Sequence, residues 1–301
     1  MNLQSAILAT LAYHDIFDYP LDSSEIGDLL VKKKARKESI ARVLERLMVM
    51  GKVGQNERYF FLKNRKKIAR IRKQRSKYSQ AKLKRAAFFA GLLKIIPSVK
   101  LVAVSGALSM ENSRRSDDID LVVVTSKGLL WTTRFLANII LLPFKRDPAG
   151  QKISDRACLN MFLDESDLSI KDHNMYTAHE ICQMRIFWDR DNTYRRFLKA
   201  NSWIREYLPN WQPNRVTSAK SQVPSHKSNK FITHHLALIT ERILCSFQLS
   251  YMKSKITTER ISKTQLFFHP KNTQEKVLKL YNQKVKRFSR TGLDKVFNIG
   301  A

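Results

Sequence analysis

Two carboxylates one residue apart give this chain its clearest candidate chemistry. Asp118 and Asp120 open an otherwise apolar segment, Leu121 to Val124, which has the composition of a buried strand. On a strand, residues i and i+2 point to the same face, so these carboxylates can converge from Cα positions about 6–7 Å apart. Desolvating them is costly unless they are paired or metal-bound, and Mg²⁺ prefers carboxylates, waters and phosphates. The pair therefore predicts a divalent metal site.

A turn of small residues precedes the carboxylate pair. Ser105, Gly106 and Ala107 follow an apolar segment that ends at Val104, and Ser109 adds a nearby hydroxyl. Small residues let the backbone approach a ligand closely, and a helix that starts here would present free N–H groups to a phosphate. A metal site beside a phosphate-binding turn is typical of phosphoryl or nucleotidyl transfer.

The turn, the spacer and the Asp-x-Asp strand together resemble the signature of the DNA polymerase β-like nucleotidyltransferase superfamily. The resemblance implies a central mixed β-sheet with flanking helices, and a nucleoside triphosphate as substrate. It implies that Asp118 and Asp120 hold one or two Mg²⁺ ions. It also implies that the nucleotide is bound by the turn residues Ser105, Gly106 and Ala107, with Ser109 nearby. A third carboxylate, on a later strand, helps to activate the acceptor hydroxyl in that superfamily.

The third carboxylate has no direct counterpart in the sequence. The matching segment, Arg156 to Leu163, is a predicted strand whose polar interior residue is Asn160. An amide oxygen can ligate a metal but cannot take a proton from an attacking hydroxyl, and a buried amide satisfied by neighbouring backbone is an equal alternative. Ala107 also departs from the Gly or Ser that the family places there. The sequence therefore predicts nucleotide and metal binding more firmly than turnover.

Composition narrows the class of protein. The 301 residues carry 55 Lys and Arg against 26 Asp and Glu, a net charge of +29, which favours a polyanionic partner such as nucleic acid. The 43% hydrophobic content supports real cores, and three scattered cysteines indicate a reducing, cytoplasmic compartment. No signal peptide or transmembrane segment is expected, since a span needs about 20 mostly apolar residues. Walker-type, HExxH and GxSxG motifs are absent from the sequence.

The first third of the chain resembles a winged helix followed by a basic helix. Residues 1–63 show three helical patterns, the third over Arg36 to Met50, and then a hairpin over residues 52–62. In the winged-helix family the third helix often enters the major groove, but nucleic-acid contact and a structural or protein-binding role are equally favoured here. Residues 64–85 form a predicted basic helical linker, either a solvated surface or one that follows phosphates.

The predicted nucleotidyltransferase core covers residues 86–170. A helical extension follows over 171–216, where Tyr176, His179 and Glu180 share one side of a predicted helix, more as a structural than as a catalytic group. Residues 217–230 are rich in Ser and Lys and predict a flexible linker, and 231–301 predict C-terminal helices. The fold class is therefore α+β.

These patterns predict an Mg²⁺-dependent nucleotidyltransferase that transfers a nucleoside monophosphate to an unidentified acceptor, with nucleic acid weakly favoured. Two alternatives stay open. One is a catalytically weak or inactive nucleotide sensor that binds nucleic acid through its winged helix. The other is the nucleotidyltransferase of a toxin–antitoxin pair.

Overall fold

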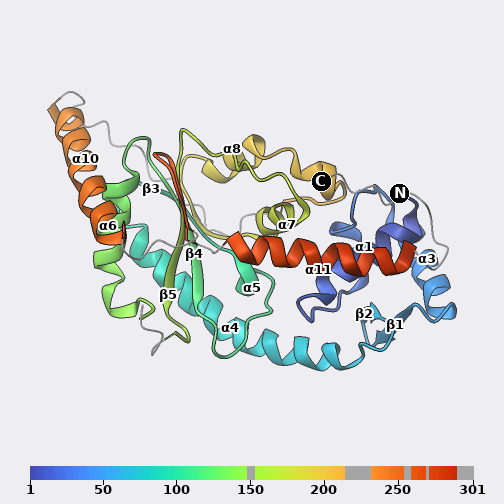
Figure 1. Ribbon diagram of the computed structural model, residues 1–301. Helices are drawn as coiled ribbons and strands as arrows, with labels where there is room; N and C mark the ends of the chain where they lie inside the picture. Colours follow the sequence, from blue (N-terminus) through green and yellow to red (C-terminus); the bar gives the residue numbers. More distant parts are fainter. Residues whose placement is uncertain (148–152, 214–231, 254–258, 269–270, 290–301) are drawn as a thin grey trace.

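The computed structural model describes residues 1–147, 153–213, 232–253, 259–268 and 271–289 (Figure 1). The chain begins with three helices and an antiparallel hairpin, all close to the predicted positions. These elements are α1 (Leu3–Asp15), α2 (Ser23–Asp28), α3 (Lys37–Val49), β1 (Val53–Asn56) and β2 (Tyr59–Leu62).

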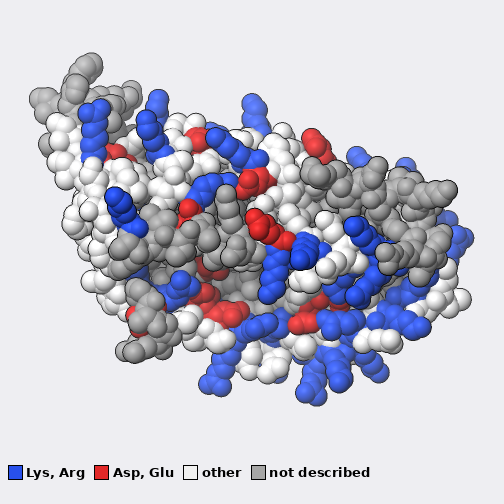
Figure 2. Space-filling model, viewed as in Figure 1, with Lys and Arg blue, Asp and Glu red and all other residues white. Residues whose placement is uncertain are grey.

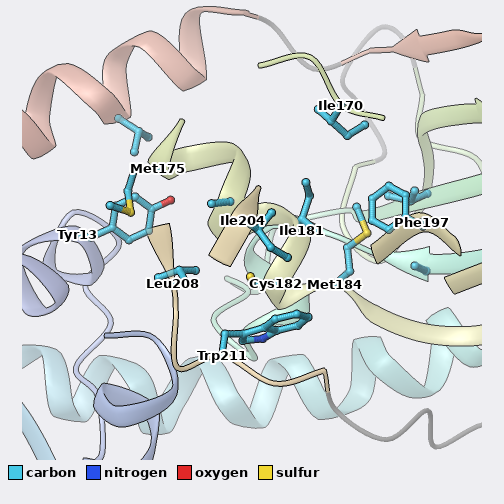
Figure 3. Close-up of a cluster of buried hydrophobic side chains, with 14 of the residues drawn as sticks. Tyr13, Ile170, Met175, Ile181, Cys182, Met184, Phe197, Ile204, Leu208 and Trp211 are labelled. Atoms are coloured by element: carbon cyan, nitrogen blue, oxygen red, sulfur yellow. The ribbon is translucent and has the colours of Figure 1, made fainter. Parts of the chain in front are cut away.

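Helix α1 is buried on almost every side. The side chain of Asn2 caps its first turn by accepting from the Ser5 N–H. Leu8 packs into the cluster formed by the first three helices, whereas Tyr13 packs into a second cluster beneath the sheet. Figure 3 shows Tyr13 beside Met175 in that second cluster. A helix that is apolar all round is typical of such a position between two cores.

Helix α4 (Lys67–Leu93) connects the hairpin to the sheet along one edge of the molecule (Figure 1). It confirms the predicted long basic helix and continues into the apolar segment beyond residue 85. Its 27 residues span about 40 Å at 1.5 Å per residue. Phe89 and Leu93 near its end are fully buried against the sheet, which anchors the helix to the core.

A six-stranded mixed sheet forms the centre of the molecule, with the strand order β6-β3-β4-β5-β8-β7. Neighbouring strands are antiparallel except β4 and β5, which are parallel. The architecture is therefore α+β with a mixed sheet. The strands are β3 (Val99–Val104), β4 (Ile119–Thr125), β5 (Ala157–Asp164), β6 (Arg185–Asp189), β7 (Arg260–Ile261) and β8 (Gln265–Phe267).

Each face of the sheet is covered by helices. Leu121 and Val123 of β4 face a cluster shared with α4 and with α6 (Leu130–Ile140), and α10 (Ile232–Lys253) packs on α6. Val122 and Val124 face the opposite cluster, which includes α1, α7 (Met175–Gln183) and α11 (Lys271–Ser289). The remaining helical segments are α5 (Gly106–Ser109), a 3₁₀ turn (Leu142–Phe144), α8 (Thr193–Ala200) and α9 (Ile204–Tyr207).

The predictions of a helical extension over 171–216 and of C-terminal helices over 231–301 are only partly correct. Helix α7 stops at Gln183, and β6 follows as an edge strand that alternates buried and less buried residues. β7 and β8 add two short strands on the opposite edge. Later in the extension, α8 and α9 are separated at Asn201, whose amide donates to the carbonyls of Leu168 and Phe197.

Two further expectations concern linkers and membranes. The predicted linker 217–230 lies outside the described residues. Within the described residues, no helix is both long and apolar enough to cross a membrane.

Candidate functional site

The two predicted carboxylates lie together at the start of β4, and a cysteine joins them. Asp120 is the second residue of β4, and its partner in the parallel pairing with β5 is Cys158. One carboxylate oxygen each from Asp118 and Asp120 and the Cys158 Sγ all lie within 4.8 Å of one another. Three potential metal ligands therefore converge on one point, and one of them is a thiol.

Asn160 lies beside this cluster. The pairing of β4 and β5 is irregular at this point, because Leu121 pairs with Leu159 whereas Val122 pairs with Met161. Asn160 is the residue passed over in this bulge and is only 2% exposed, at the wall of a neighbouring pocket. The position opposite Asp120, where the sequence gives no acid, is thus filled by Cys158.

Cys158 was missed because a cysteine in an apolar strand is usually a small core residue. One signal was available. Ile119-Asp120 and Ala157-Cys158 each place, near the start of a predicted strand, an apolar residue followed by a residue whose side chain can ligate a metal. Matching the starts of two parallel strands would have placed Cys158 opposite Asp120.

The glycine turn brings the backbone against the carboxylates. Gly106 has a φ of +65°, and a Cβ at this position would lie 3.3 Å from Asp120 Oδ2. Both the backbone conformation and the short approach therefore favour glycine. The Ser105 N–H donates to the Asp120 carbonyl (3.2 Å), so β3 and β4 hold the turn beside the carboxylate.

The other turn residues point in different directions. Ser105 is 2% exposed and lines the same pocket as Asn160, and its buried Oγ has no hydrogen-bond partner among the described residues. Ala107 is exposed on the single helical turn of α5. The Ser109 hydroxyl donates to the Gly106 carbonyl (2.7 Å) and lies at a second pocket, towards Arg72 and Glu111. Ser105 and Gly106 are thus the turn residues nearest the carboxylates and the first pocket.

Charge at the cluster is balanced in part by an arginine. Arg146 Nη1 donates to Asp118 Oδ2 at 2.9 Å, in an ion pair whose arginine side chain is half-exposed. Burial raises the pKa of the Cys158 thiol, and the negative charges of Asp120 and Asp118 raise it further. The thiol is therefore protonated beside the carboxylates, and Arg146 is one nearby cation.

A buried lysine from α4 holds the chain that leads into Asp118. Lys82 is 2% exposed, and its Nζ donates to the carbonyls of Asp117 (2.6 Å) and Arg115 (3.2 Å). It also contacts Asp155 Oδ1 at 2.7 Å, and the Asp155 N–H donates to the same Asp117 carbonyl. The main chain immediately before Asp118 is thus fixed by an ammonium group that the sequence offered only as part of a basic linker.

A pocket of about 100 Å³ adjoins the cluster between β5, β8 and α7. Its walls are mainly apolar with a few polar groups, as in many small-molecule sites. Burial raises the pKa of Tyr176, which lies at the edge of the pocket, and the charges of Glu180 and Asp120 raise it further. The carboxylate of Asp120 therefore lies near this pocket. The lining includes Ser105, Asn160, Met161, Ile170, Asp172, Tyr176, Glu180, Arg260 and Phe267.

The expected grouping of Tyr176, His179 and Glu180 on one side of α7 is only partly correct. Tyr176 and Glu180 line the pocket, whereas His179 is fully buried and is not among the lining residues. Its ring stacks on Tyr13 with centroids 3.8 Å apart, and its Nδ1 bonds to the Met175 carbonyl. His179 is therefore part of the core.

No family model, curated protein or solved structure matches the chain. The site itself combines two carboxylate ligands, one thiol, one half-exposed arginine and a partly apolar pocket, all at one end of β4 and β5.

Proposed function

We propose that this protein is a divalent-metal-dependent nucleotidyltransferase that moves a nucleoside monophosphate from a nucleoside triphosphate to an acceptor hydroxyl. The observation that carries the proposal is the convergence of Asp118 and Asp120 beside the Gly106 turn. The strand and turn order β3-α5-β4-β5 supports it, because it resembles the core of the polymerase β-like superfamily.

The two carboxylates suit Mg²⁺, which takes oxygen ligands. When bound by Asp118 and Asp120, such an ion would neutralise phosphate charge and orient the leaving group. Arg146 pairs with Asp118 through a half-exposed side chain, so it can turn to a phosphate oxygen as a second cation. Ser105 can donate its unpartnered hydroxyl to a group in the pocket.

Cys158 favours a second candidate function, a nucleotide-binding protein with little turnover. A thiol is a poor ligand for a hard ion such as Mg²⁺ and suits softer ions such as Zn²⁺. With its pKa raised, the protonated thiol also cannot accept the proton of an acceptor hydroxyl as a carboxylate would. The acceptor proton would then leave to solvent, which slows the transfer.

The N-terminal helices and hairpin support a binding role beside the enzyme core. α1, α2, α3 and the β1–β2 hairpin resemble a winged helix. The outer face of α3 exposes Arg42 and Arg46 together with Glu45, so its charge is mixed. We therefore propose a winged-helix module and assign the main contact with a polyanion to another surface, described below.

Transfer of labelled nucleotide tests the enzyme directly. The purified protein would be incubated with Mg²⁺, each α-labelled nucleoside triphosphate, and RNA, DNA or protein as acceptor. We expect transfer that falls at least about 100-fold in Asp118→Ala and Asp120→Ala. Asp117→Asn is the matched control, since this neighbouring side chain accepts from the Arg114 N–H and is not in the cluster.

Cys158→Asp separates the two candidates. If the missing acid limits turnover, this variant should transfer nucleotide at least about tenfold faster than the natural chain. Nucleotide binding without transfer by either protein, with any acceptor, would overturn the enzyme in favour of the binding protein. Equal transfer by both would show that the third position is not the limiting one.

A further inference from the structure

The outward face of α4 carries a row of positive charge with no acidic residue in it. From Arg58 to Met110 the chain contains no Asp or Glu. Five of its cations lie on one solvent-exposed stripe, which we call the α4 stripe: Lys66, Arg70, Lys73, Lys77 and Lys84. At 3.6 residues per turn these positions fall within about 60° of one another and extend over about 27 Å.

The charges of the α4 stripe are largely free to meet a partner. Lys73 pairs with Glu57 at the hairpin, and both side chains are about half-exposed. Within the part of the chain that the structure describes, no ion pair involves the other four residues. Figure 2 shows Lys and Arg side chains gathered along the edge of the molecule that α4 forms in Figure 1.

Further exposed cations lie between α4 and the carboxylate cluster. The loop that enters β4 carries Arg114 and Arg115, which are both exposed. This loop is tied to α4, since Lys82 Nζ lies 3.2 Å from the Arg115 carbonyl. Arg146 pairs with Asp118 itself. Because Lys82 and the loop lie on the face of α4 opposite the stripe, a polyanion on the stripe would have to pass round the helix, along Arg114 and Arg115, to bring one of its ends to the carboxylates.

An exposed aromatic side chain lies on the same stripe. Phe88 follows Lys84 by one helical turn and is 50% exposed. Its ring meets Phe144 edge-on, with centroids 5.4 Å apart, which leaves a supported aromatic surface beside the cations. Proteins that bind single-stranded nucleic acid combine such cation rows with aromatic rings on which unpaired bases stack.

We infer that the α4 stripe binds a single strand of nucleic acid, with the backbone on its cations and a base on Phe88. The further step, that the end of this strand is the acceptor, rests on the proposed nucleotidyltransferase function. Binding itself does not, because it needs neither nucleotide nor metal. Phosphate contacts of this kind supply affinity without sequence information.

Anisotropy of a fluorescent single-stranded oligonucleotide, titrated across a salt series without nucleotide or metal, tests the inference. The stripe variant is Lys66→Gln/Arg70→Gln/Lys77→Gln. For a single strand, each phosphate contact contributes about 0.7 to the steepness of log K against log salt. The variant removes three such contacts, so we expect the slope to become shallower by about 2. Phe88→Ala should weaken binding about tenfold and leave the slope unchanged.

The matched control removes the same charge from the opposite side. Lys171, Arg195 and Lys199 are exposed near α8, which lies across the molecule from α4 in Figure 1. Their triple change to Gln should preserve the slope. Equal losses in the two triple variants would overturn the inference, since only net charge would then matter. Binding to anionic vesicles with none to the oligonucleotide would also overturn it, in favour of a lipid surface.

Discussion

Arg70 and Arg72 are two residues apart on α4, yet one guanidinium lies in solvent and the other in the core. Arg72 is 8% exposed, and its Nη atoms contact the two oxygens of Glu25, each at 2.6 Å. Its guanidinium also lies over the rings of Tyr19 and Tyr59, at 4.1 and 4.4 Å from their centroids. Arg70 has no such environment and is exposed.

Further along α4, Lys82 and Lys84 show the same contrast, because Lys82 is buried and Lys84 is exposed. Residues two apart on a helix point about 200° from one another, so they lie on nearly opposite faces. The inner cations join α4 to the N-terminal helices and to the carboxylate loop, whereas the outer cations form the α4 stripe. A basic segment can therefore hold a fold together and present a binding surface at once, and its charge count does not separate the two roles.

The largest effect is expected for Arg72→Ala. This change leaves Glu25 without its partner and removes the packing on both tyrosines, so the free energy of unfolding should fall by about 3 kcal/mol. Arg70→Ala, the matched outer change, should stay within about 0.5 kcal/mol. Chemical denaturation of the two variants measures both values, and similar losses would remove the distinction between the faces.

Acid should lower the free energy of unfolding through buried histidines, one of which, His14, lies near Arg72. Burial and, to a smaller extent, the nearby Arg72 charge lower the pKa of His14 from 6.5 to about 4, against the opposing effect of its hydrogen bond to the Thr10 carbonyl. Burial also lowers the pKa of His179. The unfolded chain takes up these protons below about pH 6.5 while the folded chain does not, so stability is present above that pH and is lost as the pH falls towards 4.

For His14 the loss should be about 2–3 kcal/mol between neutral pH and pH of about 4.5. The free energy of unfolding across this range is the measurement, and His14→Phe should flatten it relative to the natural chain. An unchanged pH dependence in His14→Phe would mean that carboxylates alone cause the acid loss.

A smaller effect on stability, but a specific effect on the site, is expected for Lys82→Met. Loss of the bonds to Asp117, Arg115 and Asp155 should cost about 1–2 kcal/mol. Because the chain before Asp118 is then less fixed, binding of Mg²⁺ with a nucleotide should weaken about tenfold. Lys84→Met should leave both quantities unchanged. Calorimetry of the two variants measures both their stability and their affinity for the nucleotide with Mg²⁺. Equal nucleotide affinities would show that Lys82 does not position the carboxylates.

The sequence predicts the parts of the site that depend on local pattern. The strands around Asp118 and Asp120, the Gly106 turn and the strand from Ala157 are bounded by clear changes from apolar to polar residues. The contacts between elements are not local. Cys158 reaches Asp120 only through the parallel register, and the bulge at Asn160 shifts that register within a few residues.

The orientation of α4 was equally hidden. Its apolar residues are sparse in the first half, so the helical phase that buries Arg72 and Lys82 is weakly marked. Only their partners on α2 and on the 113–118 loop identify them as inner residues. β6 was missed for a similar reason, because a five-residue segment directly after a helix has too few residues to establish a strand period.

The burial of α1 bears on the order in which the chain acquires its structure. Tyr13 meets Tyr281 of α11 with ring centroids 5.7 Å apart, and Asp15 binds Lys284 across a sequence separation of 269 residues. During synthesis α1 is made long before α11 leaves the ribosome. The side of α1 that α11 covers stays exposed for most of that interval, and such long-range closure slows folding and exposes intermediates to aggregation. A chain that lost α11 would expose one side of its first helix.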